Sequence, residues 1–253
     1  MSDQPFFVGY LGLPKGLRGF IVGLAVALVA GAAGLAAAIA LTQDDPGEGA
    51  FRFDLGRQTV TGVLELTPSP VLHVTEGNEN IDVGHTLMLS GQGKNGAIQR
   101  ARALEGQTVV ASGVLLTRGD LDMLQLRGGQ DGLSAAEDAE PATPPAPEAL
   151  GRWRLAGEIC DGKCTAGAMR PGRGIGHKAC ANLCILNGIP PVFVTTQPVE
   201  GAEFLLIAGE GDDPLPQDLY DWVAEYVTLE GDVSRHGDLL VLTVDTSTLE
   251  RTP

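Results

Sequence analysis

An uninterrupted apolar stretch lies near the N-terminus of the sequence. Residues 19–41 contain no charged residue, no proline and no strongly polar side chain. At about 1.5 Å per residue, a helix of this length crosses a hydrocarbon core of about 30 Å. The apolar part of a secretory signal peptide has only about 7–15 residues. The pattern therefore predicts a retained transmembrane helix over 19–41, although Ala38-Ile39-Ala40 resembles a cleavage site.

Beyond residue 50 the apolar positions form the short alternating runs that are typical of β-strands. Residues 108–116 alternate, pass a Gly-Asp turn and continue in a second run at 121–126, which predicts a β-hairpin. A second hairpin of the same kind is predicted from 226–233 and 239–244. Each hairpin is preceded by a helix-like segment, at 97–104 and at 216–223. The predicted unit is a small β-barrel of about five strands, which resembles the OB-fold.

One offset aligns the two predicted barrels with each other. A shift of 118 residues superimposes six positions of the first half on the second. The pairs are Gly91–Gly209, Gly93–Gly211, Gly113–Gly231, Gly119–Gly237, Asp120–Asp238 and Leu121–Leu239. Six matches at one offset indicate an internal duplication. The expected fold class is mainly β, with one N-terminal transmembrane helix followed by two duplicated small OB-like β-barrel domains, the second with a Cys/His-rich insertion.

Composition sets the expected domain boundaries. Residues 134–150 are rich in Pro, Ala and Glu, a composition that cannot form a core and is typical of a semi-rigid linker. Residues 1–18 have aromatic residues in the pattern of an amphipathic arm on the membrane surface. The expected parts are a cytoplasmic amphipathic arm (1–18), the transmembrane helix (19–41), a linker (42–50), the first OB-like domain (51–133), the Pro/Ala-rich linker (134–150) and the second OB-like domain (151–253) with its insertion (160–188).

Charge gives the expected orientation and excludes one class of partner. Lys15 and Arg18 precede the apolar stretch, whereas acidic residues follow it, so the positive-inside rule predicts a cytoplasmic N-terminus. The expected location is the bacterial inner membrane, with the bulk of the chain in the periplasm. Residues 42–253 carry 15 Lys and Arg against 31 Asp and Glu. So acidic a surface repels phosphate backbones and excludes nucleic acid as a partner.

Small residues recur every four positions along the apolar stretch. Two such series are Gly23, Ala27 and Gly31, and Ala30, Gly34 and Ala38. Small residues at this spacing let a second helix approach closely within a membrane. The series predict contact with transmembrane helices of a larger complex or of a second copy; the alternative is a plain single-pass anchor without a partner.

All four cysteines fall in the second predicted domain. The chain is much longer from Gly157 to Gly209 than from Gly62 to Gly91, so the second copy has gained a segment after its first strand. An even number of cysteines in an oxidising compartment ordinarily forms disulfides. Bridges that close loops of about 16–20 residues would each stabilise the fold by about 3 kcal/mol. Disulfides are therefore the default expectation, with no defined connectivity.

A metal or cluster site is the alternative for the same residues. The candidate ligands are Cys160, Cys164, His177, Cys180 and Cys184. Their spacing is C-x3-C, a 15-residue spacer and a second C-x3-C, with the histidine three residues before the second pair. The histidine and the second pair would share one face of a short helix. Soft donors of this kind suit zinc, copper or an iron–sulfur cluster.

The insertion resembles a motif of uncharacterised membrane-anchored proteobacterial proteins, K-C-x-x-G-x-M-x-P-G-x-G-x-x-H-x-x-C-A-x-x-C followed by G-I-P-P. The matching residues are Lys163, Cys164, Gly167, Met169, Pro171, Gly172, Gly174, His177, Cys180, Cys184 and 188–191. The resemblance covers 157–194 and the anchor, and it implies no activity. The motif itself is specific.

The remaining residues predict no catalytic site. His73, His85 and His236 have no partner at metal-ligand spacing and are expected to be ordinary strand or turn residues. Asp120 and Asp238 are explained by the turns that they occupy. The sequence contains no C-x-x-C-H haem motif and no phosphate loop. The chain therefore favours a non-catalytic protein.

Two functions remain from the sequence. The first is a membrane-anchored periplasmic accessory subunit of a respiratory or redox complex, acting through protein–protein contacts. The alternative is a metal-binding or thiol-redox protein that uses the Cys/His insertion.

Overall fold

The computed structural model describes residues 16–42, 47–137, 139, 142–209 and 215–252. The chain divides into two compact units, Met1–Asp45 and Pro46–Pro253. The predicted amphipathic arm, 1–18, lies outside the described residues except at 16–18.

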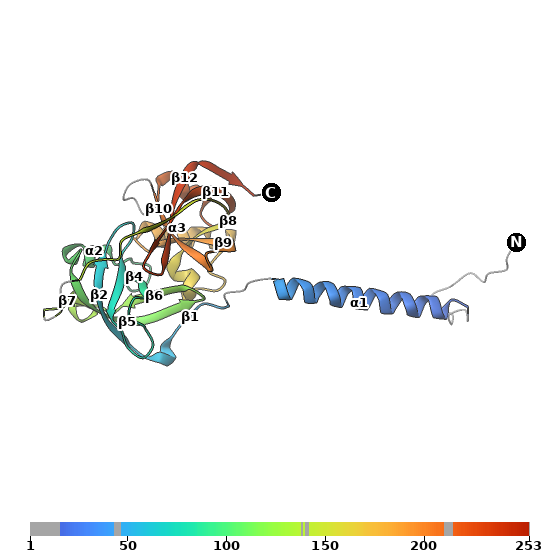
Figure 1. The fold of residues 1–253 in the computed structure, drawn as a ribbon, viewed down its shortest axis with the longest axis horizontal. Helices are drawn as coiled ribbons and strands as arrows, with labels where there is room; N and C mark the ends of the chain where they lie inside the picture. The colour runs from blue at the N-terminus through green and yellow to red at the C-terminus, as the bar shows by residue number, and fades with distance from the viewer. Residues whose placement is uncertain (1–15, 43–46, 138, 140–141, 210–214, 253) are drawn as a thin grey trace. The chain divides into compact units, whose positions relative to one another are not determined.

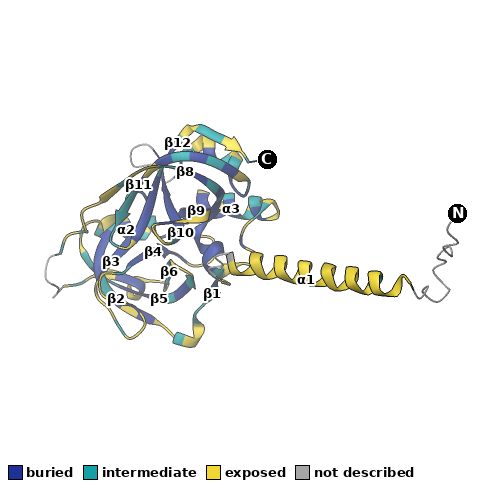
Figure 2. Cartoon of the chain, turned by 45° about the vertical axis from the view of Figure 1, so that its right-hand side comes forward, coloured by how far each residue is buried: buried dark blue, intermediate teal, exposed yellow. Residues whose placement is uncertain are grey.

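The first unit contains helix α1, Arg18–Thr42. Its side chains are exposed along almost the whole helix (Figure 2). Within the described chain, the segment Arg18–Leu41 is long and apolar enough to cross a membrane, with a mean hydropathy of 2.4. The apolar helix predicted over 19–41 is therefore present, and its candidacy as a membrane span rests on length and composition.

The second unit begins with a β-sheet of seven strands. The strands are β1 (Ala50–Phe51), β2 (Gln58–Glu65), β3 (Val71–Glu76), β4 (Thr86–Ser90), β5 (Thr108–Arg118), β6 (Leu121–Leu126) and β7 (Leu133–Ala135). Short helices lie between them: η1 (Phe53–Leu55), α2 (Ile98–Ala101), η2 (Arg102–Leu104) and η3 (Gln130–Gly132). β2 pairs with β3 and β5, β3 with β4, β4 in parallel with β6, and β6 with β5. These pairings return to the strand from which they start, so the five strands form a ring.

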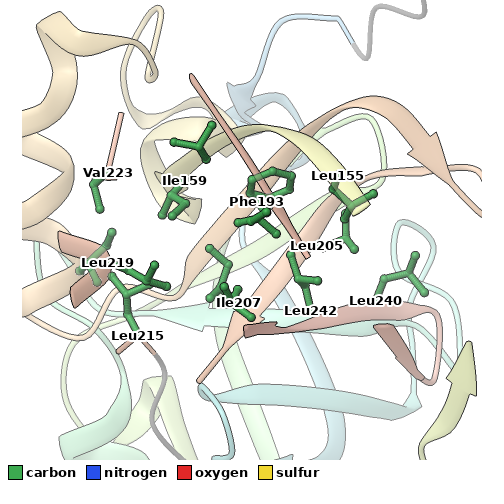
Figure 3. Packing of buried hydrophobic residues seen from close by; sticks show 14 of the residues in the cluster. Leu155, Ile159, Phe193, Leu205, Ile207, Leu215, Leu219, Val223, Leu240 and Leu242 are labelled. Atoms are coloured by element: carbon green, nitrogen blue, oxygen red, sulfur yellow. The ribbon is translucent and has the colours of Figure 1, made fainter. Parts of the chain in front are cut away.

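The remaining strands form a closed five-stranded barrel, shown yellow to red in Figure 1. They are β8 (Glu148–Asp161), β9 (Pro191–Val199), β10 (Ala202–Ala208), β11 (Tyr226–His236) and β12 (Leu239–Arg251). Helix η6 (Gln217–Trp222) precedes β11. The barrel is filled by side chains that include Leu155, Ile159, Phe193, Leu205 and Leu242 (Figure 3).

The two barrels have the same strand connectivity and register. A shift of 118 residues carries the bounds of β5 onto those of β11. It also carries the parallel pair Met88–Met123 onto the parallel pair Leu206–Val241. The structure explains why glycine stands at the matched positions Gly113 and Gly231. A Cβ atom on either residue would overlap a carbonyl oxygen of the neighbouring strand. The repeated residues therefore occupy equivalent places in the two barrels.

The barrels pack against each other through a shared hydrophobic core. This core draws on equivalent positions of both barrels. The pairs are Val71 and Val192, Met88 and Leu206, Leu121 and Leu239, and Met123 and Val241. The two predicted domains therefore form one compact unit. The linker predicted over 134–150 overlaps β7 at one end and β8 at the other; between these strands, the described residues 136, 137, 139 and 142–147 belong to no helix or strand.

The turn aspartates make reciprocal contacts between the barrels. Asp120 accepts hydrogen bonds from the backbone N–H groups of Glu203 (3.2 Å) and Phe204 (3.5 Å). Asp238 accepts a hydrogen bond from the N–H of Thr86 (2.8 Å), the position equivalent to Phe204. Each hairpin turn thus holds the third strand of the other barrel, so the contacts of these aspartates extend beyond the turns that the sequence assigned to them.

His85 also connects the two barrels. The sequence had predicted that it is an ordinary strand or turn residue. Its Nε2 atom lies 2.9 Å from the Asp122 carboxylate, and its Nδ1 atom bonds Asp238 of the other barrel. The hydrogen bond to Asp122, followed by that to Asp238, raises the pKa of His85 to about 10. The imidazolium is therefore an ionic bridge between the barrels at neutral pH.

Replacing His85 with glutamine is expected to lower the free energy of unfolding by about 1–2 kcal/mol, less than at a fully buried pair because the side chain is partly exposed. Because the folded pKa is above the ordinary value of 6.5, the stabilisation is complete below pH 6.5 and is lost as the pH rises through about 10. Denaturant unfolding of both proteins at pH 6 and pH 11 measures this difference. His236→Gln is the control, because His236 bonds Ser234 of its own hairpin. An equal difference at both pH values would contradict the ionic bridge.

Candidate metal centre

The Cys/His insertion occupies the connection between β8 and β9, residues 162–190. The equivalent connection in the first barrel, between β2 and β3, is only 66–70. The insertion contains a π-helical turn η4 (Cys164–Ala168), a 3-10 turn η5 (Ile175–His177) and helix α3 (Lys178–Leu186). It is seated on the first barrel, where the N–H of Gly96 donates to the carbonyl of Asn187 at 2.8 Å. The site is therefore built at the junction of the two barrels.

Three cysteines of the insertion converge. The Sγ atoms of Cys164, Cys180 and Cys184 all lie within 4.8 Å of one another, and we call these three residues the thiol cluster. Cys180 and Cys184 share one face of α3 because they are four residues apart. Cys164 faces them from η4 and is buried, as is Cys184, whereas Cys180 is partly exposed. The cluster therefore has one side open to solvent.

The buried pair of Asp161 and His177 connects the two segments that carry the thiol cluster. The carboxylate of Asp161 lies 2.9 Å from Nε2 of His177, which immediately precedes α3. Its other oxygen accepts the backbone N–H of Cys164 at 2.8 Å. Both side chains are almost completely buried. Asp161 thus fixes the turn that carries Cys164 relative to the helix that carries Cys180 and Cys184.

Two lysines lie against the thiol cluster. Nζ of Lys94, from the loop after β4, lies 2.6 Å from Sγ of Cys180 and 3.9 Å from Sγ of Cys184. Lys163 is buried and donates to the carbonyls of Gly91 (2.6 Å) and Gly93 (2.8 Å) in the same loop. The chain has only four lysines, so half of them are concentrated here. The ammonium groups favour the thiolate form of the cysteines.

The thiols are electrostatically different from one another. A hydrogen bond from Cys164 lowers the pKa of Cys184 to about 7. The same hydrogen bond, together with burial, raises the pKa of Cys164 well above its ordinary value. Burial lowers the pKa of Lys163 to about 8, although Cys184 and Cys164 oppose the change. Cys184 is consequently the thiol that ionises most readily in this pair.

Cys160 lies apart from the other cysteines. It is on β8, paired with Val192, and belongs to the hydrophobic core between the barrels. Its thiol donates to the carboxylate of Glu158 at 3.2 Å, and burial, with the neighbouring Glu158, raises its pKa. All four cysteines are free thiols in this structure. The expected disulfides stay a prediction, and Cys160 is outside the thiol cluster from which they would be drawn.

No family model matches this chain, and no curated protein or solved structure matches it. The chemistry of the site therefore follows from its own donors. Three thiols that converge on one point suit a soft cation such as Zn²⁺ or Cu⁺. Asp161, Cys164 and His177 form a second group of possible ligands within 4.8 Å. Asp161 already bonds both His177 and the backbone N–H of Cys164. We therefore assign Asp161 and His177 the role of positioning the thiols.

Of the five predicted ligands, the structure brings three together, places His177 beside them and separates Cys160. Sequence reasoning did not identify Asp161, Lys94 or Lys163 as part of the site. The sequence did contain an indication for Lys163, since this residue is the first of the K-C motif. Lys94 had none, because it belongs to the other barrel and lies far from every cysteine in the sequence.

Proposed function

We propose that this protein binds a thiophilic metal ion at the thiol cluster of a membrane-tethered β unit. The observation that supports the proposal is the convergence of three thiols with two lysine ammonium groups beside them. Thiolates are the ligands that soft d¹⁰ cations prefer. The Asp161–His177 pair supplies the outer hydrogen bonds that metal sites use to orient their ligands. The geometry thus favours the metal-binding alternative over the accessory-subunit hypothesis.

Metal titration of the purified full chain in detergent tests the proposal. We expect one Zn²⁺ or Cu⁺ ion per chain. Cys164→Ser, Cys180→Ser and Cys184→Ser are each expected to lower the affinity by at least about 100-fold, because each removes a ligand. Affinity is measured by competition with a chromogenic chelator under anaerobic conditions.

Cys160→Ser is the matched control for these variants. It replaces a thiol that the structure places outside the cluster, so we expect an unchanged stoichiometry and affinity. Equal losses in Cys160→Ser and in the cluster variants would contradict the assignment. Counting free thiols in the same samples separates the competing functions. A permanent disulfide among the cluster thiols and no bound metal would remove the metal site, whereas reversible loss of two thiols would support thiol redox chemistry.

The membrane location is proposed together with the metal site, and a role as an accessory subunit is the second candidate function. We infer that α1 spans the bacterial inner membrane with a cytoplasmic N-terminus and that the β unit is periplasmic; the flanking charges support this orientation. The small residues of α1 suit contact with transmembrane helices of a redox complex or of a second copy. Affinity purification of the solubilised chain tests the complex, and recovery of a monomer alone would argue against it.

We also infer that the two barrels are OB-like copies of one ancestral domain. The shared connectivity, the shared register and the matched positions of the interface core support this inference. In an OB-fold the loop after the first strand is a common binding loop, and the insertion occupies that loop in the second barrel.

A further inference from the structure

We infer that helix α3 of the insertion is a second membrane contact, which binds the anionic lipid surface of the bilayer that α1 crosses. The inference rests on the proposed membrane location of the chain but not on the metal site. It follows from the outer face of α3, from the charge of the segments around it and from the short chain between α1 and the insertion.

The outer face of α3 is apolar. Ala179, Leu183 and Leu186 follow one another at the spacing of one helix face, and all three are exposed. Leu186 is 67 % exposed, and Ile175, just before the helix, is 66 % exposed. The opposite face of α3 is also apolar and is buried against the β unit. A surface helix ordinarily has a polar outer face, whereas a helix that is apolar on both sides is covered on both. The outer face of α3 is therefore suited to a partner.

The segments that form this surface are basic, in contrast to the rest of the chain. Residues 92–104 and 162–190 contain seven of the 17 Lys and Arg and none of the 32 Asp and Glu. The two segments are in contact, since the N–H of Gly96 donates to the carbonyl of Asn187, just after α3. Basic residues beside exposed apolar side chains are typical of segments that lie in the lipid interface. The surface thus complements an anionic bilayer.

Two arginines of these segments are available to lipid headgroups. Arg102 and Arg173 are exposed and form no salt bridge within the described chain. Arginine keeps its charge throughout the physiological pH range. Exposed carboxylates elsewhere on the acidic chain are largely screened beyond about 8 Å at physiological ionic strength. The carboxylates that contact the insertion are already bonded to it: Glu48 to Arg170, Glu158 to the N–H of Gly174, Asp161 to His177 and Glu225 to Lys178.

The chain between α1 and the insertion is short. α1 ends at Thr42, and Glu48 already forms a salt bridge with Arg170 of the insertion. Gly49 then packs so closely on the insertion that a Cβ atom there would overlap the backbone of Ala166. An extended chain covers at most about 3.6 Å per residue, so residues 43–48 reach no further than about 20 Å. The bilayer that holds α1 is therefore within reach of the insertion.

Leu186→Trp tests the lipid contact in the full chain. The variant is reconstituted in nanodiscs that contain anionic lipid, with and without bromine on the acyl chains, and the emission of the wild type is subtracted. We expect a blue-shifted emission that brominated lipid quenches at least about twofold, because an interfacial side chain lies about 5–10 Å into the headgroup boundary. A blue shift without quenching would indicate a second copy or an acidic protein partner and would overturn the lipid assignment.

Val83→Trp is the matched control. Val83 is also 67 % exposed, but it follows Asp82 in the β3–β4 loop, so we expect its emission to stay unquenched and red-shifted. Equal quenching in the two variants would overturn the inference. Metal titration of Leu186→Trp separates the outcomes: a chain that binds metal without quenching fails only the lipid contact, whereas a quenched chain without metal fails only the metal site. A chain that does not enter the discs fails the proposed location.

Arg173→Gln, made in the Leu186→Trp chain, tests the charge. We expect the ratio of lipid-bound to free α3 to fall about 5-fold, the effect of one arginine at an anionic surface. The ratio is measured from the quenching as anionic lipid is replaced by zwitterionic lipid. Arg154→Gln is the control, since Arg154 is exposed on β8 and pairs with Glu250. Quenching that ignores both Arg173→Gln and the anionic lipid would overturn the assignment of an anionic surface.

Discussion

Replacing Asp161 with alanine is expected to lower the free energy of unfolding by about 3–5 kcal/mol, because it breaks a buried pair and leaves one partner without compensation. The variant leaves His177 without its carboxylate and the backbone N–H of Cys164 without an acceptor. The side chain of Asp161 is completely buried, so water does not replace these bonds. Denaturant unfolding of the full chain in detergent measures the loss.

Asp161→Asn separates the role of this residue in folding from its role at the proposed metal site. Asparagine keeps an oxygen acceptor for the Cys164 N–H, so the expected loss of stability is only about 1–2 kcal/mol. Metal affinity is expected to fall by about 10- to 100-fold, as it does when an outer hydrogen bond to a metal site is altered, with the stoichiometry unchanged. Asp218→Ala, at an exposed position, is the control. Unchanged metal affinity in a folded Asp161→Asn variant would show that Asp161 does not position the thiols.

Phe193→Ala is expected to lower the free energy of unfolding by a similar amount, about 3–5 kcal/mol. Phe193 is fully buried at the centre of the second barrel, among Ile159, Leu205 and Leu242 (Figure 3). Its removal loses apolar burial and leaves a cavity that the closed barrel cannot fill by relaxing. Because the barrels share an interface core, we expect one unfolding transition for both.

Phe53→Ala is the matched control for this prediction. Phe53 is 70 % exposed and stacks on Phe51, so its loss is expected to change the free energy of unfolding by less than about 1 kcal/mol. A loss of the same size in both variants would show that the burial of Phe193 does not account for its effect. Two separate transitions in the wild type would show that the barrels unfold independently.

The β-hairpins could be predicted from the sequence because each depends on local information. Alternating apolar positions determine which side chains face the barrel interior, and the Gly-Asp turns locate the reversals. Gly119 and Gly237 have positive φ angles, which glycine adopts without strain. The predicted short helices were also found, at α2 with η2 and at η6. The barrel closure, by contrast, depends on long-range pairing that no local pattern records.

The candidate site could be predicted only in part, because its members come from distant segments. The two C-x3-C pairs look alike in sequence, yet Cys180 and Cys184 lie on one helix whereas β8 continues through Cys160 and leaves only Cys164 in the turn. The alternating pattern that ends β8 is short, and spacing alone would keep Cys160 as a ligand. Lys94 reaches the cluster only because the barrels pack together, which is a tertiary effect.

The reciprocal contacts of Asp120 and Asp238 have a consequence for how the site is maintained. Contacts of this kind, in which equivalent positions on two bodies bind each other in turn, are typical of an isologous dimer interface. Here both halves belong to one chain, so their association does not depend on protein concentration. The thiols of one half and the ammonium of Lys94 on the other are consequently assembled in every molecule, even where the protein is sparse.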